Sequence, residues 1–470
     1  MKLQRALDAY ARAFQRYLPS PFAIAVLLTL LAAGLSLRHA PAPAVLDAWV
    51  HGLWDAGLLR FGFQAMFMLV LGHVLALAPP VVRVLQRAVR WTVQTPLLAP
   101  AKVALLSMLM GWLNWGLGLI AGAILVRGVL DGRRRGEVRG SIHPGVLGAA
   151  GYTGLLVWHG GLSGSAPLKV AEHGHMASLV PGASWASELP DAVTLRETVL
   201  SAWSLGLTMA VMAAVVAVFW WLGSRTESEA WQREPEGTES ENSSNREGQG
   251  MDAVQDPHSW ADRLDTGRAL PWMLGASCFG GAWLWAAQSG PWTKLAFVTP
   301  DWINLMLLGL ALVAHGSVRG ILHALDEAIS GASGILVQFP LYFGIMGMVT
   351  GTGLGAWLAD ALVGATPATM LPEALFVSSG VLNVFVPSGG GQWAVQGPLV
   401  LEACHALGVP VERGIMAMAF GDQLTNMLQP FWALPLLGIT GLSARDILPY
   451  TLLVMAVAGA VMAVGMAFWV

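Results

Sequence analysis

Charged side chains are scarce in this sequence. They make up 12% of its 470 residues, whereas hydrophobic residues make up 55% and the mean hydropathy is +0.58. A soluble domain carries roughly 25% charged residues, so the composition excludes an ordinary soluble protein. The net charge of −3 also excludes the strongly basic surface that nucleic-acid binding needs. Long apolar runs separated by short polar segments predict an all-α polytopic protein embedded in the lipid bilayer.

Cysteine is nearly absent. Cys278 and Cys404 both lie in or beside apolar segments and have no metal-ligand spacing. A disulfide framework and a cysteine metal centre are therefore excluded. No cofactor is expected other than a coupling ion, H⁺ or Na⁺. No small-residue cleavage site follows the first apolar run, which predicts a retained first helix and not a signal peptide.

Basic residues gather in a few places and predict the orientation of the chain. The N-terminal segment and the segments 83–102 and 127–139 are rich in arginine. The positive-inside rule places all three in the cytoplasm of a bacterial inner membrane, with a cytoplasmic N-terminus. The apolar segment 103–130 then has cytoplasmic ends on both sides. It predicts a re-entrant hairpin that bends near Asn114, the alternative being two ordinary short helices.

The segment 224–268 is polar and divides the chain in two. We expect a disordered cytoplasmic linker there, between membrane repeats at 1–223 and 269–470. The second half has its own hairpin at 361–401, flanked by acidic residues and therefore entering from the opposite side.

Each half also contains an apolar segment broken by polar residues, at 159–167 and at 422–430. The segment 315–333 is amphipathic and predicts an interfacial helix before a span at 334–349. This organisation predicts two inverted-topology repeats, each with a re-entrant hairpin and a discontinuous transmembrane helix. Such repeats are typical of secondary transporters, which bind substrate and ions near the bilayer midplane.

Two long motifs carry a family resemblance. They are Val386-Pro-Ser-Gly-Gly-Gly-Gln-Trp-Ala-Val-Gln-Gly-Pro398 and Gly421-Asp-Gln-Leu-Thr-Asn-Met-Leu-Gln-Pro-Phe-Trp-Ala-Leu-Pro435. With 338–348 and 151–167, they resemble the short-chain fatty acid uptake family, the bacterial carriers named for acetoacetate and butyrate. The resemblance spans nearly the whole chain outside 224–268. It implies membership of the wider ion-transporter superfamily, a short monocarboxylate as substrate, and a homodimer.

A short carboxylate needs donors for two oxygens and an apolar wall. Glycine-rich turns and helix N-termini supply backbone N–H groups without a cationic side chain. The predicted substrate-binding residues are Ser163, Gly164, Ser165, Ser388, Gly389, Gly390, Gly391, Gln392, Trp393 and Gln429. No arginine or lysine lies inside the breaks, which favours a monocarboxylate over a dicarboxylate. The residues Trp393, Met427, Phe431 and Trp432 could form the wall, or could simply pack between helices.

Asp422 is the main candidate for ion coupling, because an ionisable side chain inside a membrane span is costly. It could bind Na⁺ together with Asn383, Thr425 and Asn426, or carry a proton; alternatively it caps the helix that resumes after the break. His159 is a second proton-carrier candidate. Asn114 and Asn383 occupy matching hairpin positions and could be paired ligands, or could each bond their own turn.

The sequence is also compatible with other functions. The segment Gly161-Leu162-Ser163-Gly164 matches the pattern around the serine of rhomboid-type intramembrane proteases, which would need His73 or His159 as base. A carrier or exporter of another organic anion is a further alternative. A channel is less favoured, because paired broken helices suit alternating access.

Overall fold

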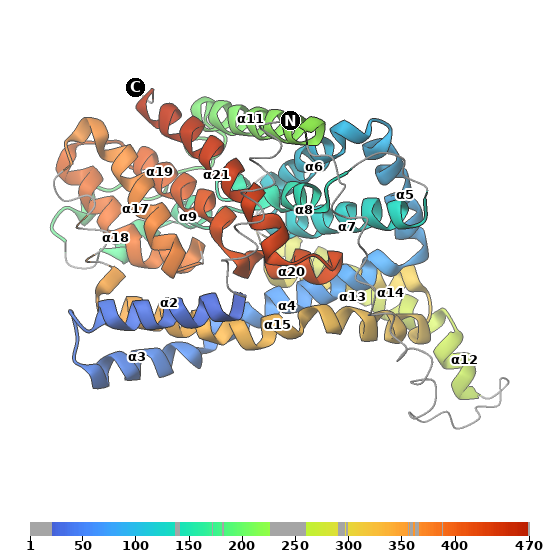
Figure 1. The fold of residues 1–470 in the computed structure, drawn as a ribbon. Helices are drawn as coiled ribbons and strands as arrows, with labels where there is room; N and C mark the ends of the chain where they lie inside the picture. The colour runs from blue at the N-terminus through green and yellow to red at the C-terminus, as the bar shows by residue number, and fades with distance from the viewer. Residues whose placement is uncertain are drawn as a thin grey trace.

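The computed structural model describes residues 21–136, 142–171, 173–180, 183–225, 260–289, 297, 299–355, 357, 361, 366–387 and 389–468. Within these residues the protein is almost entirely helical and contains no β-strand (Figure 1). The first half contains α2 (Pro21–Ser36), α3 (Ala42–Leu53), α4 (Ala56–Leu77), α5 (Pro79–Val93), α6 (Ala99–Leu113), α7 (Trp115–Arg134), α8 (Pro144–Tyr152), α9 (Ser165–Val170), α10 (His175–Leu179) and α11 (Ala202–Arg225). The second half contains α12 (Trp260–Thr266), α13 (Ala269–Gln288), α14 (Pro300–His315), α15 (Val318–Gly351), α17 (Leu371–Phe385), α18 (Gly389–Leu407), α19 (Val411–Thr425), α20 (Pro430–Thr440) and α21 (Ala444–Ala467).

The helices confirm the membrane class by length and composition. Five described segments are long and apolar enough to cross a bilayer: Pro96–Leu113, Trp115–Arg134, Ala202–Arg225, Ala368–Phe385 and Ala444–Ala467. A bent pair, Ala42–Arg60 with Gly62–Leu75, would make a sixth; its two parts meet at 51°. The protein is therefore embedded in a membrane.

Helices α6 and α7 form the first helical hairpin, with Asn114 between them. Glycine is required where they cross, because a Cβ on Gly118 would lie 2.4 Å from the Cα of Gly111. Arg90 before the hairpin and Arg127 near its end line the same cavity, so both basic ends lie on one side. The helical hairpin is confirmed, and its re-entrant depth stays a prediction.

Helices α17 and α18 form the second hairpin. Gln392 and Gln396 on α18 reach back to α17: the Gln392 Nε2 donates to the carbonyl of Ser379 (3.0 Å), and the Gln396 Nε2 donates to the hydroxyl of Ser378 (2.7 Å). A broken helix follows each hairpin. The first is α8, a 3₁₀ turn η2 (Thr153–Leu156), a non-helical stretch and α9; the second is α19, a 3₁₀ turn η7 (Asn426–Leu428) and α20. The order of elements thus repeats, while the inverted orientation remains a prediction.

A layer of long helices supports this pair of hairpins. In Figure 1, α2, α3 and α15 run side by side along the lower edge, below α6–α8 on the right and α17–α19 on the left. Two glycines bring α3 and α15 into backbone contact: a Cβ on Gly52 would lie 2.4 Å from the carbonyl oxygen of Phe343, and one on Gly347 would lie 2.3 Å from that of Ala48.

The predicted interfacial helix at 315–333 and the span at 334–349 are in fact one helix, α15, of 34 residues. Ser317 caps its start by accepting from the Gly320 N–H, directly after Gly316 ends α14 at φ +65°. No comparable stop follows until Gly353 at φ +76°, and Pro340 is accommodated inside the helix. The amphipathic pattern of 315–333 is therefore one part of a longer helix.

Most of the predicted linker, residues 226–259, lies outside the described residues. Its last part differs from the prediction, because Trp260–Thr266 is helical. Asp262 in this helix pairs with Arg319 of α15 at 2.6 Å, so α12 is attached to the membrane-embedded part. Helix α3 is a further element that the sequence did not predict.

Candidate functional site

The two broken helices meet at their breaks. We call residues 157–164 the first break and residues 426–429 the second break. The Tyr152 hydroxyl lies 2.8 Å from the carbonyl oxygen of Asn426 and 3.0 Å from that of Gln429, and it can donate to either. In return, the Gly160 N–H donates to the Gln423 Oε1 (2.9 Å). Backbone N–H and C=O groups that lose their helical partners at one break therefore form hydrogen bonds with side chains of the other half. Inside a membrane such groups must be paired within the protein.

Each break is also attached to the hairpin of its own half. The Leu162 N–H donates to the carbonyl of Trp112 (2.8 Å), and the Ser163 hydroxyl accepts the Trp115 N–H at the start of α7 (2.9 Å). In the second half, the Gln429 Nε2 donates to the carbonyl of Asn383. Hairpin ends and breaks therefore form one connected polar region inside an apolar protein.

His159 and Asp422 face each other across this region. The His159 Nδ1 lies 3.2 Å from the Asp422 Oδ1, and the two side chains are 0% and 1% exposed. The angles are not those of a hydrogen bond, and both Asp422 oxygens lack a hydrogen-bond partner among the described residues. The His159 Nε2 accepts the Ala166 N–H (3.1 Å), which assigns the proton of a neutral imidazole to Nδ1, the atom facing the carboxylate. A buried carboxylate beside a histidine can hold a cation or pass a proton.

Three oxygens converge on the amide of Asn383. Its Nδ2 lies 2.7 Å from the backbone oxygen of Asp422, 3.0 Å from the Thr425 Oγ1 and 2.9 Å from the Asn426 Oδ1. The Asn383 Oδ1 is buried and lacks a partner within the described part of the chain. Turning this amide over would bring four oxygens together, a donor set that suits Na⁺.

All four predicted Na⁺ ligands are therefore brought together, with one difference in detail. Asp422 offers its backbone carbonyl to this group, while its carboxylate turns toward His159. In the regions that the structure describes, no cluster of three or more His, Cys, Asp or Glu side chains could hold a metal ion.

The glycine-rich start of α18 lies against the first break. A Cβ on Gly389 would lie 2.7 Å from Trp158 and 3.0 Å from the His159 Cε1, and one on Gly390 would lie 4.0 Å from the Ser165 hydroxyl. A Cβ on Gly164 would lie 2.1 Å from the carbonyl oxygen of His159. These predicted substrate-binding glycines and Ser165 are thus close to the His159–Asp422 pair. Ser388 lies outside the described residues.

Other predicted site residues hold the hairpins together. Asn114 caps α7 by accepting the N–H groups of Gly116 and Leu117, so its oxygen serves its own helix and the pairing with Asn383 is not reproduced. Gln392 bonds Ser379 and Gln396.

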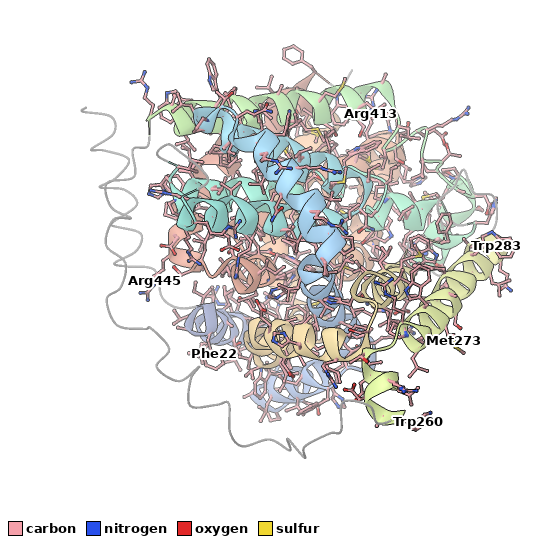
Figure 2. All side chains as sticks on the ribbon, turned by 90° about the vertical axis from the view of Figure 1, so that its right-hand side faces the viewer. Phe22, Trp260, Met273, Trp283, Arg413 and Arg445 are labelled. Atoms are coloured by element: carbon pink, nitrogen blue, oxygen red, sulfur yellow. The ribbon has the colours of Figure 1, made fainter. Side chains whose placement is uncertain are left out.

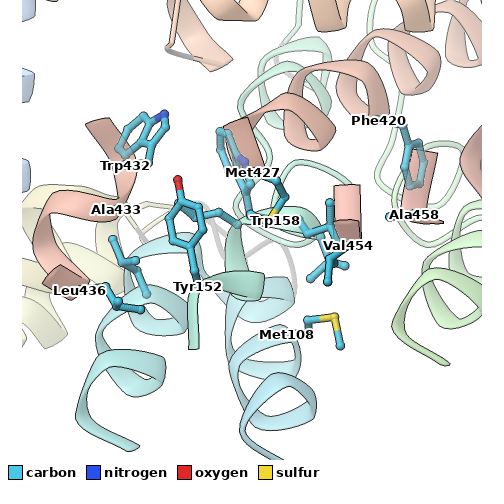
Figure 3. Close-up of a cluster of buried hydrophobic side chains, with 14 of the residues drawn as sticks. Met108, Tyr152, Trp158, Phe420, Met427, Trp432, Ala433, Leu436, Val454 and Ala458 are labelled. Atoms are coloured by element: carbon cyan, nitrogen blue, oxygen red, sulfur yellow. The ribbon is translucent and has the colours of Figure 1, made fainter. Parts of the chain in front are cut away.

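Trp393 is 1% exposed, and its indole N–H donates to the His175 Nε2 (3.0 Å). Gly391 follows Gly390 in the first turn of α18. The ring of Trp432 packs edge-on against Trp115 at 5.5 Å between centroids. Figure 3 shows Tyr152, Trp158 and Met427 close together among the buried side chains where the breaks meet.

Tyr152 and Gln423 were missed by the sequence reasoning, although each lies in a motif that carries the family resemblance. Tyr152 joins the breaks through its hydroxyl, and Gln423 follows Asp422 directly and accepts from Gly160. A buried tyrosine hydroxyl and a buried amide inside apolar segments are the signals that could have found them.

The protease hypothesis requires a histidine beside Ser163. Within the described residues no hydrogen bond joins Ser163 to a histidine, and the Ser163 hydroxyl accepts from Trp115. His159 directs Nε2 to the Ala166 N–H and Nδ1 to Asp422, and His73 lines a different cavity.

Broken helices that meet at buried ionisable groups, in a helical membrane protein, define a membrane transporter. The family model described as "Short chain fatty acid transporter" matches residues 2–469. The chain belongs to this family.

Two relatives, from Escherichia coli K12 and Haemophilus influenzae Rd, both carry the name "Putative short-chain fatty acid transporter". They are 32% and 30% identical over 97% and 96% of this chain, and the matches cover 97% of each relative. The chain is also similar to the crystal structure of the Alcanivorax borkumensis YdaH transporter, with 16% identity over 96% of this chain and 99% of that chain and a TM-score of 0.40.

Proposed function

We propose that this protein is a secondary active transporter that moves short-chain monocarboxylates, such as butyrate or acetoacetate, in symport with H⁺ or Na⁺. One observation carries the proposal: the 3.2 Å contact between His159 of the first break and Asp422 of α19. It supports coupling because the only strongly buried carboxylate–histidine pair in the described region joins the two halves that alternating access would move.

The polar atoms around the breaks fit an anion together with a cation. Among the described residues, the buried donors without a hydrogen-bond partner include the His159 Nδ1, the Trp158 Nε1 and the Gln423 Nε2. The corresponding acceptors include the Asp422 carboxylate, the Asn383 Oδ1 and the Gln429 Oε1. Unpaired donors suit a carboxylate and unpaired oxygens suit a cation, because a buried polar atom without a partner costs about 1–3 kcal/mol.

The absence of arginine and lysine from both breaks favours a monocarboxylate. A monoanion bound by neutral donors beside a cation needs no guanidinium, whereas a dicarboxylate would leave a second charge uncompensated. The relatives' printed name supports the same substrate class.

We place the protein in a bacterial inner membrane with a cytoplasmic N-terminus, two inverted repeats and a homodimeric assembly.

The test is uptake of radiolabelled butyrate and acetoacetate into proteoliposomes, under a pH gradient and a Na⁺ gradient applied separately. We expect one gradient to drive uptake and Asp422→Asn to abolish that drive. Asp47→Asn is the matched control, because the Asp47 carboxylate is exposed on α3. Gradient-driven uptake that survives in Asp422→Asn would remove this residue from coupling. Failure of all short monocarboxylates to enter or compete would overturn the substrate class.

A further inference from the structure

A second cavity lies away from the two breaks, between α4, α5, α7 and the end of α20. Its volume is about 460 Å³, within the range of roughly 300–1,000 Å³ of small-molecule sites. None of its lining residues belongs to either break. In Figure 1, α5 lies at the right-hand edge, and Figure 2 turns that face toward the viewer.

The cavity carries a surplus of positive charge. Arg90, Arg127 and Arg135 line it, against the single carboxylate of Asp131. That carboxylate is already paired with Arg127 at 2.7 Å and with Arg134 at 3.6 Å. The guanidinium of Arg90 is exposed and has no hydrogen bond or ion pair in the described part of the chain. An anion would therefore be attracted to this wall and would find an unengaged donor there.

The lining also includes an apolar wall. Val82 and Val89 of α5, Ile124 of α7 and Ile439 of α20 form it, on the same helices as the arginines or in contact with them. A ligand that fills the space must accordingly combine an anionic group with a hydrocarbon portion. A short carboxylate would satisfy the charge but leave most of this wall uncovered.

Helix α5 has the properties of a helix at the membrane surface. Arg83, Arg87 and Arg90 alternate with valine and leucine along it. Trp91 is exposed near its end, and the ammonium of Lys102 lies 4.8 Å over the Trp91 ring. Basic amphipathic helices with interfacial tryptophan lie at the level of the lipid headgroups. A cavity lined by α5 would then lie at the level of the headgroups.

We propose that this cavity binds an acidic membrane phospholipid. Its phosphate lies among Arg90, Arg127 and Arg135, and part of its acyl chain covers Val82, Val89 and Ile124. Basic pockets between membrane helices recognise acidic headgroups in this manner. The inference is independent of the transported substrate and of the coupling ion.

The bound lipid would act on the second broken helix through Arg127. This guanidinium donates to the carbonyl of Ile439 (2.9 Å), at the end of α20, and to Asp131. A phosphate beside Arg127 would hold the same guanidinium in place, so α20 would be more firmly attached to α7 when lipid is bound. The site is thus suited to regulate the helix that begins at the second break.

The experiment is lipid titration of the delipidated full-length protein, followed by native mass spectrometry. Phosphatidylglycerol is compared with phosphatidylcholine of identical acyl chains, with glycerol phosphate and butyrate as competitors. We expect phosphatidylglycerol to bind at least about fivefold more tightly than phosphatidylcholine, since each basic residue near the surface contributes about 1 kcal/mol. Competition by glycerol phosphate would overturn the lipid in favour of a soluble phosphate. Competition by butyrate would assign the cavity to the transport path instead.

Three variants localise the site. Arg90→Ala should weaken phosphatidylglycerol binding by about fivefold, whereas Arg87→Ala, on the same helix but outside the cavity, should weaken it by less than about twofold. Val82→Phe should also weaken binding, because it fills the apolar wall without changing charge. If Arg87→Ala and Arg90→Ala weakened phosphatidylglycerol binding equally, the lipid would be attracted by the overall positive charge of α5 and not bound in this cavity. Unchanged binding in both Arg90→Ala and Val82→Phe would place the lipid elsewhere.

Discussion

The imidazole of His159 and the carboxylate of Asp422 lie 3.2 Å apart, fully buried, although they come from opposite halves of the chain. His159 belongs to the first break, and Asp422 lies one helical turn before the second. Each half of the protein therefore contributes one ionisable group to a single site. Relative motion of the two halves would act directly on this contact, as the proposed coupling role requires.

The pair should show strong energetic coupling. His159→Ala removes the imidazole that faces the buried Asp422 carboxylate, and we expect a loss of about 1–3 kcal/mol in unfolding free energy. Adding Asp422→Asn should restore part of this stability, because an amide carries no charge. Denaturant unfolding in detergent measures all four members of the double-mutant cycle.

The exposed pair His51–Asp47, at 3.4 Å on α3, is the matched control, and its coupling should be below about 1 kcal/mol. Equal and additive effects at the two pairs would contradict a direct interaction between His159 and Asp422.

The oxygens around Asn383 should bind Na⁺ if its amide turns over. We expect Na⁺ to raise the Tm of the wild type relative to K⁺, because a ligand that binds the folded state stabilises it. Thr425→Val removes one oxygen at nearly constant volume and should abolish the difference. Thr440→Val removes a hydroxyl that donates to Leu436 and accepts from Leu442, away from this group of oxygens, and should keep the difference. Identical melting of the wild type in Na⁺ and K⁺ would leave the proton as the coupling ion.

Gly389 should not tolerate a side chain. A methyl group there would lie 2.7 Å from Trp158 and 3.0 Å from His159, so Gly389→Ala must shift the first break, at a cost of about 1–3 kcal/mol. We expect uptake to fall sharply while the protein remains folded. Gly280→Ala on α13 meets no atom within 4 Å and serves as the control. Normal uptake by Gly389→Ala would show that the start of α18 need not contact the first break.

The loop before α11 should loosen in acid. The hydrogen bond from His173 lowers the pKa of Asp191 below its ordinary value of 3.8, assisted by the charge of His173 and the Gly174 N–H. Because the folded pKa is lowered, the stabilisation is fully present above about pH 3.8 and is lost as the pH falls through the folded value. Hydrogen exchange at the Gly174 amide, corrected for intrinsic rate, should rise over this range.

Asp191→Ala, which leaves the Gly174 N–H only the backbone carbonyl of Asp191 as an acceptor, should show faster exchange at neutral pH as well. Protection of Gly174 that does not depend on pH in the wild type would contradict the role assigned to Asp191.

The sequence by itself determined the membrane class, the two helical hairpins and the locations of both breaks. These features are local. An apolar run without charge must leave water, and Gly, Pro and Asn interrupt a helix wherever they occur. The break predicted at 422–430 contains η7, between α19 and α20, and Asn114 ends α6 and caps α7 through bonds to its nearest neighbours.

Only the tertiary structure decided what the polar residues do. Asn114 and Asn383 are the same residue type in matching hairpins, yet one caps its own helix and the other bonds three oxygens from α19 and η7. The Asp422 side chain faces His159, a residue from the other half, and that choice depends on how α19 packs against the first break. Contacts between residues so distant along the chain depend on how whole helices pack against one another. The local sequence pattern does not determine that packing.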